Sequence, residues 1–201
     1  MRLFVAVEIE PRVIEALAAC GDELRRRAAR ARRARITWVP ADRLHVTVRF
    51  IGEVDDARTQ AIASALAPVL SAAPFELTVQ RVGTFPEHGP PRVLWAGTGG
   101  GADALVAVEA DVSTRLDGCG VPREPRPYHP HITLARVREP GGLRTATWLT
   151  GWTDRHFGVS PVNAITLFES RPSPQGHVYV ALQRTPLIPA GPPSAGPALR
   201  T

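Results

Sequence analysis

The chain alternates between short apolar runs and longer segments in which apolar residues recur every three or four positions. Short runs with a period of two, or short continuous runs, are typical of strands, and the wider spacing is typical of amphipathic helices. The pattern predicts eight strands, at about 2–8, 43–51, 75–82, 92–98, 131–138, 155–160, 162–168 and 177–184.

Helices are predicted between these strands. In the first of them Val13, Leu17, Cys20 and Leu24 recur at the spacing that places them on one face. Aspartates that can cap a helix N-terminus and glycines that can end a helix set the bounds of the others. The predicted helices span about 11–33, 56–70, 101–117 and 141–150.

The order strand, helix, strand, helix, strand occurs twice, over about residues 2–82 and 92–160. Such a repeat indicates an internal duplication of the architecture, although the two halves differ in sequence. We therefore predict an α+β protein of two lobes with a cleft between them. Residues 1–184 would form this single domain, and the Pro-rich tail over 185–201 is expected to be disordered.

The sequence His-apolar-Thr-apolar occurs twice, as HVTV at 45–48 and HITL at 131–134. Composition alone would give roughly 0.09 such matches in a chain of this length. Side chains alternate along a strand, so each His shares a face with its Thr, and the apolar partners point the other way. Each copy also lies on the strand between the two helices of its half. The pattern therefore predicts one shared polar site in the cleft.

Two histidines at one site favour acid–base chemistry over metal binding. A zinc site needs three or four ligands, and neither copy has a Cys or acidic residue at ligand spacing. Imidazole titrates near neutrality, so one ring can accept a proton while the other donates one. Hydrolysis of a phosphodiester needs both, on oxygens roughly in line across phosphorus, with ring nitrogens about 6–8 Å apart. Each Thr hydroxyl can donate to a non-bridging phosphate oxygen.

The composition, with 44% hydrophobic and 21% charged residues, is that of a globular protein. The first apolar run, LFVAV, is too short for the core of a signal peptide, and no later run approaches the length of a membrane span. Two cysteines are too few for a disulfide framework. We therefore expect a cytoplasmic protein without membrane association, and a monomer.

All 24 basic residues are Arg, and the chain has no Lys, although its net charge is +5. This absence excludes a ligase that forms a lysyl-nucleotide, and it excludes Schiff-base chemistry with pyridoxal phosphate. It also excludes a P-loop at Gly99–Gly101, because that motif needs a Gly-Lys pair. Arg suits phosphate binding, but codon bias in a GC-rich genome explains the same preference.

The segment RRRAARARRAR, at 25–35, has seven Arg in eleven residues. Two interpretations stay open for it: a solvated outer helix face, or a platform for the RNA backbone. Arg49 follows Thr47 with the period of a strand and is expected either to face the cleft or to be solvated.

Several other residues are candidates for a place at the cleft. His129 precedes His131 by two positions, and Pro130 interrupts the strand between them, so a structural role is expected for His129. Phe85, Tyr128 and Trp95 are candidates for stacking a base at the cleft. The apolar neighbours of Trp95 favour a place in the core.

The segments DRLHVTVRFIGEV (42–54) and RPYHPHITLARV (126–137) resemble the two signature segments of the 2H phosphoesterase superfamily. More narrowly, they resemble the RNA 2′,3′-cyclic phosphodiesterases, historically called 2′-5′ RNA ligases. The resemblance covers about residues 1–184. It implies a bilobal fold of two antiparallel sheets with helices outside, and pseudo-twofold symmetry about a central cleft.

The resemblance also implies an activity and roles for five residues. The activity is opening of a 2′,3′-cyclic phosphate to a 2′-phosphate, on RNA ends or nucleotides, without metal or organic cofactor. By position, His45 resembles the acid that protonates the 3′ leaving oxygen, and His131 resembles the base that activates water. Thr47, Thr133 and Arg136 resemble phosphate-binding residues. Strict alternation places Arg136 on the face opposite His131, so the strand must twist or end for it to reach the phosphate.

Other functions fit the same pattern. Reversible joining of 2′-5′ RNA linkages is one, and it would proceed here without a lysyl-nucleotide. A phosphodiesterase of a small cyclic nucleotide is another. A module that only binds RNA or a nucleotide is the third, although binding alone does not need two proton carriers.

Overall fold

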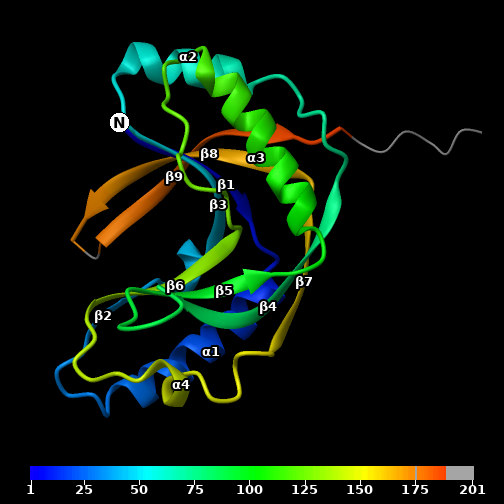
Figure 1. Cartoon of the computed structure of the whole chain (residues 1–201). Helices are drawn as coiled ribbons and strands as arrows, with labels where there is room; N and C mark the ends of the chain where they lie inside the picture. The colour runs from blue at the N-terminus through cyan, green and yellow to red at the C-terminus, as the bar shows by residue number, and fades with distance from the viewer. Residues whose placement is uncertain (175, 189–201) are drawn as a thin grey trace, which may run out of the picture.

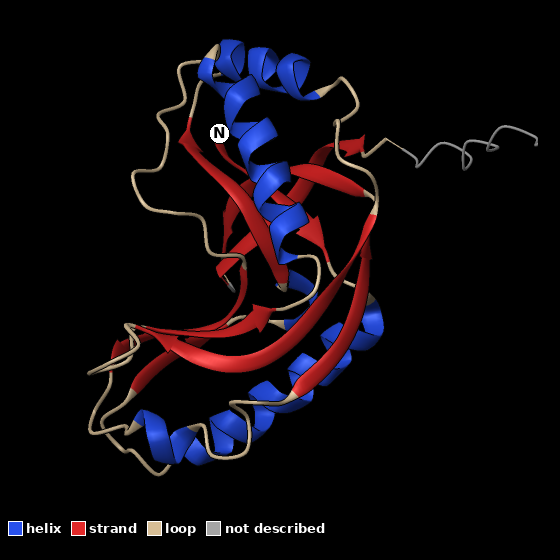
Figure 2. Cartoon of the chain, turned by 45° about the vertical axis from the view of Figure 1, so that its right-hand side comes forward, coloured by secondary structure: helices blue, strands red, loops and turns tan. Residues whose placement is uncertain are grey.

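One antiparallel sheet runs through the whole molecule (Figures 1 and 2). The computed structural model describes residues 1–174 and 176–188. In these residues the strands follow the order β7-β4-β5-β6-β3-β1-β8-β9. The short strand β2 lies off this path and pairs with β6. The strands are β1 (Arg2–Glu8), β2 (Arg35–Trp38), β3 (His45–Glu53), β4 (Phe75–Phe85), β5 (Val93–Thr98), β6 (His131–Glu139), β7 (His156–Val162), β8 (Ala164–Ser173) and β9 (Gly176–Pro186).

Helices cover the two outer ends of this curled sheet. Figure 1 shows α2 and α3 at one end of the molecule and α1 and α4 at the other, with the strands between them. The predicted α+β bilobal fold is therefore confirmed. The helical segments are α1 (Pro11–Ala28), the 3-10 turn η1 (Ala41–Arg43), α2 (Asp56–Leu66), α3 (Ala102–Asp117) and α4 (Thr145–Trp148).

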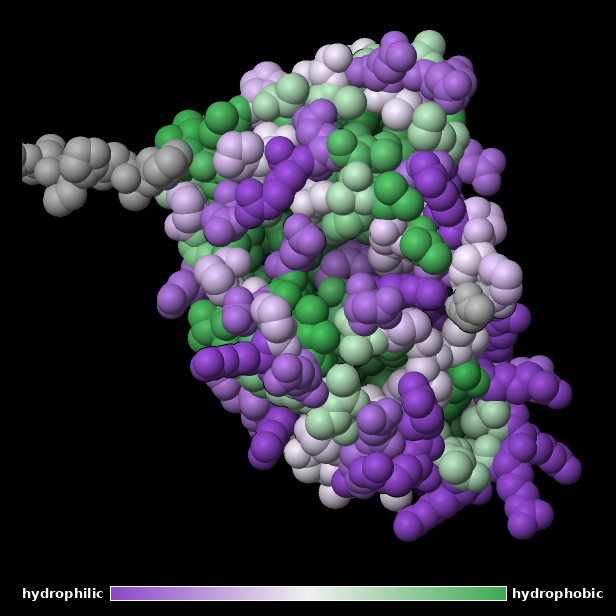
Figure 3. Space-filling view, turned by 180° about the vertical axis from the view of Figure 1, so that it is seen from behind, coloured by the Kyte–Doolittle hydropathy of each residue, from purple (hydrophilic) through white to green (hydrophobic). Residues whose placement is uncertain are grey.

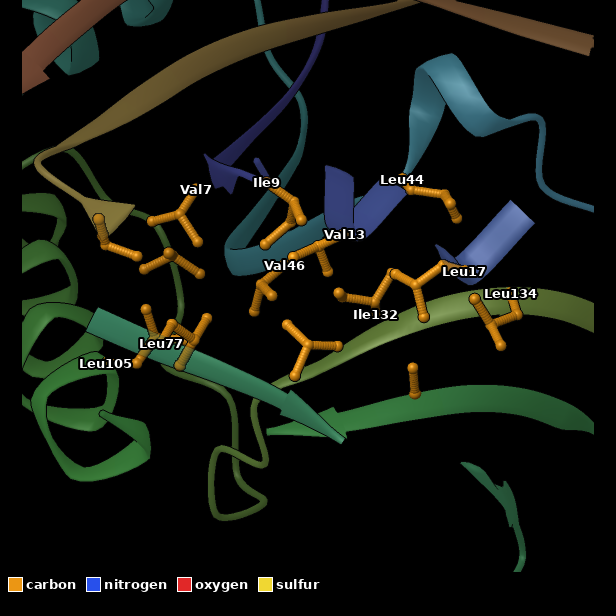
Figure 4. Packing of buried hydrophobic residues seen from close by; sticks show 14 of the residues in the cluster. Val7, Ile9, Val13, Leu17, Leu44, Val46, Leu77, Leu105, Ile132 and Leu134 are labelled. Carbon is orange, nitrogen blue, oxygen red and sulfur yellow. The ribbon is translucent and has the colours of Figure 1, made fainter. Parts of the chain in front are cut away.

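The two predicted sheets are joined into one. The half-sheets β9-β8-β1-β3 and β7-β4-β5-β6-β2 meet where β3 pairs with β6, at Val46 and Ile132. Both side chains are fully buried. They belong to the same core cluster as Val13 and Leu17 of α1, and Figure 4 shows these residues side by side. The core therefore runs through the junction between the lobes.

Each lobe draws on both halves of the sequence. α1 follows β1 in sequence but packs against β7 and α4, in the other lobe. Its attachment includes a hydrogen bond from Trp148 Nε1 to the carbonyl of Leu24, at 2.9 Å. α3, from the second half, packs against β3. The duplicated order of elements thus describes two interlocked units.

The structure corrects the predicted end of α1, which stops at Ala28 instead of residue 33. Most stabilisation of a helix in a protein comes from packing of its apolar face, and Ala28 is the last buried residue of this face. The Arg-rich run continues through a turn into β2, a strand of four residues that the apolar pattern did not predict. Figure 3 shows hydrophilic side chains gathered at the end of the molecule formed by α1 and β2.

The structure also corrects the predicted boundary of the domain. β9 continues to Pro186, and Leu187 is buried, with its backbone N–H bonded to the carbonyl of Asn163 at 2.9 Å. The Thr185 hydroxyl donates to the carbonyl of Leu66 at 2.7 Å. The folded part therefore extends beyond residue 184. The rest of the predicted tail, residues 189–201, lies outside the described residues.

Packing at the junction of the half-sheets predicts that substitutions of two isoleucines differ in their effect on the free energy of unfolding. Ile132→Ala should lower the free energy of unfolding by about 2–5 kcal/mol, because it leaves a cavity in the core. Ile188→Ala is the matched control, since that side chain is 47% exposed, and its effect should stay below about 1 kcal/mol. Urea unfolding followed by circular dichroism measures both. Equal losses would show that the junction does not depend on this packing.

Candidate active site

The two motif strands have the same burial pattern over six residues. In both His45–Phe50 and His131–Arg136 the order is half-buried, buried, half-buried, buried, buried, exposed. Two consecutive buried residues break the alternation that a regular strand would give. The cause lies in how each strand pairs with its neighbour.

In β3 the extra residue is Val48. Ala6 of β1 pairs with Thr47 and Val5 pairs with Arg49, so two neighbouring residues on β1 face three on β3. This is a β-bulge, in which one inserted residue reverses the faces of the residues that follow.

In β6 the extra residue is Leu134, at the equivalent position. Trp95 of β5 pairs with Thr133, and Leu94 pairs with Ala135. The same irregularity thus occurs at the same distance from both motif histidines. The pseudo-twofold relation between the halves extends to this local distortion of the backbone.

The bulges decide which residues reach the cleft. After the bulge Arg136 returns to the face of His131, as the predicted role of this residue requires, and it lines the same cavity. Phe50 holds the equivalent position on β3 and lines the cavity too. Arg49, equivalent to Ala135, is turned away from that face and is only 3% exposed.

The pairing of Val46 with Ile132 brings the two motifs together. In an antiparallel pair the neighbours of these residues lie on the other face, so His45 and Thr47 are on the same side as His131 and Thr133. The two histidines occupy diagonal positions, which are typically about 7–8 Å apart. Both histidines, both threonines and Arg136 line one cavity of about 1000 Å³.

Both imidazole rings are oriented by the backbone two residues earlier. Nδ1 of His45 lies 2.8 Å from the carbonyl oxygen of Arg43, and Nδ1 of His131 lies 2.8 Å from that of His129. A carbonyl oxygen can only accept, so Nδ1 carries the proton and Nε2 of the neutral ring is the basic nitrogen. Nε2 of His45 lies 3.0 Å from the Thr47 hydroxyl, which then donates to it.

Burial lowers the pKa of both histidines below the ordinary value of 6.5. Desolvation is the main cause, because it disfavours the charged imidazolium. The charge of His131 lowers the pKa of His45 further, and Arg136 and His129 do the same for His131. The backbone hydrogen bonds oppose these effects. Both rings are therefore mainly neutral near pH 7 in the absence of a ligand.

Aromatic rings surround each histidine. The His45 ring packs against Phe4, at a centroid distance of 5.1 Å, and against Tyr179, at 5.3 Å and edge-on, and these two rings also contact each other. Phe85 lies 5.2 Å from His131, also edge-on. These rings limit contact of the imidazoles with water. Sequence patterns did not identify Phe4 and Tyr179. They lie on β1 and β9, and only the order of the strands in the folded sheet brings these strands to the side of His45.

The remaining candidates take varied positions. Phe85 lines the cavity and is 37% exposed. Tyr128 lines it too, and its hydroxyl donates to the Thr47 carbonyl at 2.9 Å. Trp95 is half-buried opposite Thr133, on the cleft face, so its predicted place in the core is wrong. His129 is exposed and acts on His131 through its carbonyl.

Arg49 is buried on the face opposite His45, so it is not solvated, and it lines the part of the cavity beside α3. Its guanidinium lies 3.6 Å from Glu109 of α3 and donates to the carbonyl of Pro122. The seven arginines of the 25–35 segment lie apart from the cavity wall. Arg26 and Arg27 pair with Glu23, and Arg25 stacks on Trp38 at 5.3 Å.

Two further properties of the described residues bear on the site. In residues 1–174 and 176–188 no group of three or more His, Cys, Asp or Glu side chains is arranged to hold a metal ion. None of the helices in this part of the chain has the length and apolarity to cross a membrane.

Comparison with known proteins identifies a family. The model of the 2′-5′ RNA ligase superfamily matches residues 10–170. The RNA 2′,3′-cyclic phosphodiesterase of Aeropyrum pernix is 34% identical over 145 residues, which cover 72% of this chain and 82% of the relative. The one from Methanocaldococcus jannaschii is 29% identical over 184 residues, which cover 91% and 99%.

Solved structures agree with the sequence comparison. TT0787 of Thermus thermophilus superposes with a TM-score of 0.72 at 29% identity and covers 93% of this chain and 98% of its own. E. coli LigT complexed with 3′-AMP superposes with a TM-score of 0.72 at 26% identity, covering 92% and 97%.

The electrostatics of the site predict an NMR result. Both His45 and His131 should titrate below pH 6.5, because burial disfavours the charged ring, and both should carry the neutral proton on Nδ1. Inorganic phosphate should raise both pKa values, since a nearby anion favours imidazolium. Long-range ¹H–¹⁵N spectra measure pKa and tautomer, with assignment by His45→Gln and His131→Gln. A proton on Nε2 of either neutral ring would contradict the geometry.

Proposed function

Because the chain belongs to the 2′-5′ RNA ligase superfamily, we propose that it is an RNA 2′,3′-cyclic phosphodiesterase that uses two histidines to open the cyclic phosphate and leave a 2′-phosphate end. One observation carries the proposal: His45 and His131 occupy diagonal positions on one face, at the junction of the half-sheets. A reaction that protonates one apical oxygen of phosphorus and deprotonates the opposite one requires such a pair.

His131 acts as the base. Its Nδ1 proton is held by the His129 carbonyl, so Nε2 can take a proton from water. Burial keeps its pKa low, which maintains the neutral form that a base requires near pH 7. The water oxygen attacks phosphorus, and a new P–O bond forms as the proton passes to the ring.

His45 acts as the acid. It donates a proton from Nε2 to O3′ while the P–O3′ bond breaks, and the phosphate stays on O2′. The low pKa of His45 in the free protein disfavours the charged form that an acid needs. A phosphate anion bound beside the ring reverses this preference. Substrate binding therefore prepares the acid.

Thr47, Thr133 and Arg136 bind the non-bridging oxygens. They line the same cavity as the two histidines. Once His45 carries its second proton, its Nε2 no longer accepts from the Thr47 hydroxyl, so Thr47, Thr133 and Arg136 can each donate to an oxygen whose charge grows in the transition state. The guanidinium of Arg136 can bind two oxygens at once. The bulge at Leu134 supports this role, because it turns Arg136 to the face of His131.

The same geometry supports joining of RNA ends. A 5′-hydroxyl in place of water would give a 2′-5′ linkage by attack on the same phosphorus, with O3′ again as the leaving oxygen. Such joining needs no lysyl-nucleotide, in keeping with a chain that has no Lys.

Activity on an RNA that ends in a 2′,3′-cyclic phosphate should persist in EDTA. The proposed steps are carried by protein groups, so removal of divalent ions should leave kcat within about twofold. The measurement compares rates with and without EDTA and with added Mg²⁺ or Mn²⁺. A strict requirement for an added ion would contradict the two-histidine mechanism.

The histidines should differ in their response to a modified substrate. His45→Ala and His131→Ala should each lose at least about 100-fold in kcat. Sulfur in place of the 3′ leaving oxygen needs little protonation, so this substrate should restore much of the activity of His45→Ala. It should not restore that of His131→Ala, which still lacks its base. Single-turnover rates on both substrates measure the effect.

Other outcomes of this experiment are equally informative. Rescue of His131→Ala instead would reverse the two roles. Rescue of neither variant, with folding confirmed by circular dichroism, would mean that both histidines only bind phosphate. The double variant should lose much less than the product of the single losses, because the two groups serve one transition state.

A further inference from the structure

The pseudo-twofold symmetry fails at one place beside the site. The contact of β3 with β6 ends at Ile132. From Ala135 onward, the same edge of β6 pairs with β2 instead, and Trp38 is the partner of Ala135. Beyond Val46 the corresponding edge of β3 has no strand beside it within the described residues. The segment between α3 and β6 runs past this edge instead (Figure 1).

Sequence spacing shows what that segment replaces. Trp38 precedes His45 by seven positions, and Glu124 precedes His131 by seven. Arg49 is the equivalent of Ala135. Full symmetry would therefore pair the main chain around Glu124 with Arg49, as the main chain of Trp38 pairs with Ala135.

Side chains bridge the gap where this pairing is missing. The guanidinium of Arg49 donates to the carbonyl of Pro122, and the hydroxyl of Tyr128 donates to the carbonyl of Thr47 at 2.9 Å. Four residues of the segment are prolines, at 122, 125, 127 and 130, and proline has no N–H to give to a strand ladder. The segment is thus attached to β3 but held away from its backbone.

The active-site cavity continues into this gap. Its volume of about 1000 Å³ is at the upper limit of small-molecule sites, and its wall passes from the histidines to α3. Arg123 is already paired with Asp117. Arg126 is exposed and forms no ion pair with any described residue. In this part of the wall are Arg49, Glu109, Ser113, Arg123, Glu124 and Arg126.

The assigned roles of the histidines fix the direction of the substrate. The leaving oxygen O3′ belongs to the terminal ribose, and its acid, His45, begins β3. The attacking water would lie next to its base, His131, which is the first residue of β6. The His45 ring packs against Phe4 and Tyr179, in the half-sheet that also carries α3. The ribose and the RNA on its 5′ side therefore lie toward that half-sheet, and the gap beside β3 and α3 opens into the same part of the cleft.

We propose that the gap between β3, α3 and residues 122–128 binds the nucleotide that precedes the cyclic-phosphate end, with Arg126 on its phosphate. The terminal base stacks on Phe50, which is 49% exposed where the other half carries Arg136. This inference rests on the proposed function and adds a preference for RNA ends over cyclic mononucleotides. It also gives the asymmetry of the two halves a role, because the gap lets the RNA chain leave the site past β3, whereas β2 closes the equivalent place in the other half.

Substrate length tests the proposal. We compare kcat/KM for a nucleoside 2′,3′-cyclic phosphate and for a dinucleotide with the same 3′ end. The dinucleotide should be about 10-fold better or more, the scale expected of one stacked base and its phosphate. Arg126→Ala should remove most of that advantage, and Arg126→Lys should restore part of it, because Lys still supplies a charge.

Arg32→Ala is the matched control. It removes one positive charge from an exposed position away from the cavity wall, and the advantage of the dinucleotide should persist. Equal rates of the wild-type protein on the two substrates would overturn the subsite. Equal losses from Arg32→Ala and Arg126→Ala would overturn it as well, since they would show a general effect of net charge.

A binding measurement separates this proposal from the proposed function. If the wild-type protein opened neither cyclic phosphate, the proposed function would fail. The subsite would then be judged by affinity for a dinucleotide that ends in a 2′-phosphate, measured by calorimetry. Arg126→Ala must weaken that binding about 10-fold more than it weakens binding of the 2′-phosphorylated nucleoside. Equal weakening would overturn the subsite on its own.

Discussion

The antiparallel contact of Val46 with Ile132 holds the two half-sheets together, and the site depends on it. Both side chains are fully buried in a core shared by the lobes, so their neighbours must face the cleft. This single constraint places two histidines and two threonines side by side, although 86 positions separate the copies in sequence (131 − 45). A slip of one residue in either strand would turn the His and the Thr of that strand away from the cleft. Apolar packing thus fixes the polar geometry.

The second constraint is the backbone irregularity after each motif. A bulge at Val48 and another at Leu134 turn Phe50 and Arg136 back toward the cavity. One half therefore presents an aromatic ring where the other presents a cation. The symmetric frame supplies the acid and the base, and this difference gives the site two unlike sides.

The repeated motif predicted the shared face of His45, Thr47, His131 and Thr133, since strand alternation depends only on local sequence. Arg136 could be placed only by resemblance, because the bulge that turns it depends on pairing with β5. The buried pair of Arg49 with Glu109 joins β3 to α3, a contact between segments far apart in sequence. β2 was missed because four residues carry too little periodicity, and its partner β6 supplies the stabilisation.

The central claim is that the acid and the base act on opposite oxygens of one phosphorus, with O3′ as the leaving oxygen. Hydrolysis of an RNA with a 2′,3′-cyclic phosphate in H₂¹⁸O tests it most directly, with the product read by ³¹P NMR and mass spectrometry. The account predicts a single product that ends in a 2′-phosphate and carries one ¹⁸O on phosphorus. A 3′-phosphate product would contradict the assigned positions of the two histidines relative to the ribose.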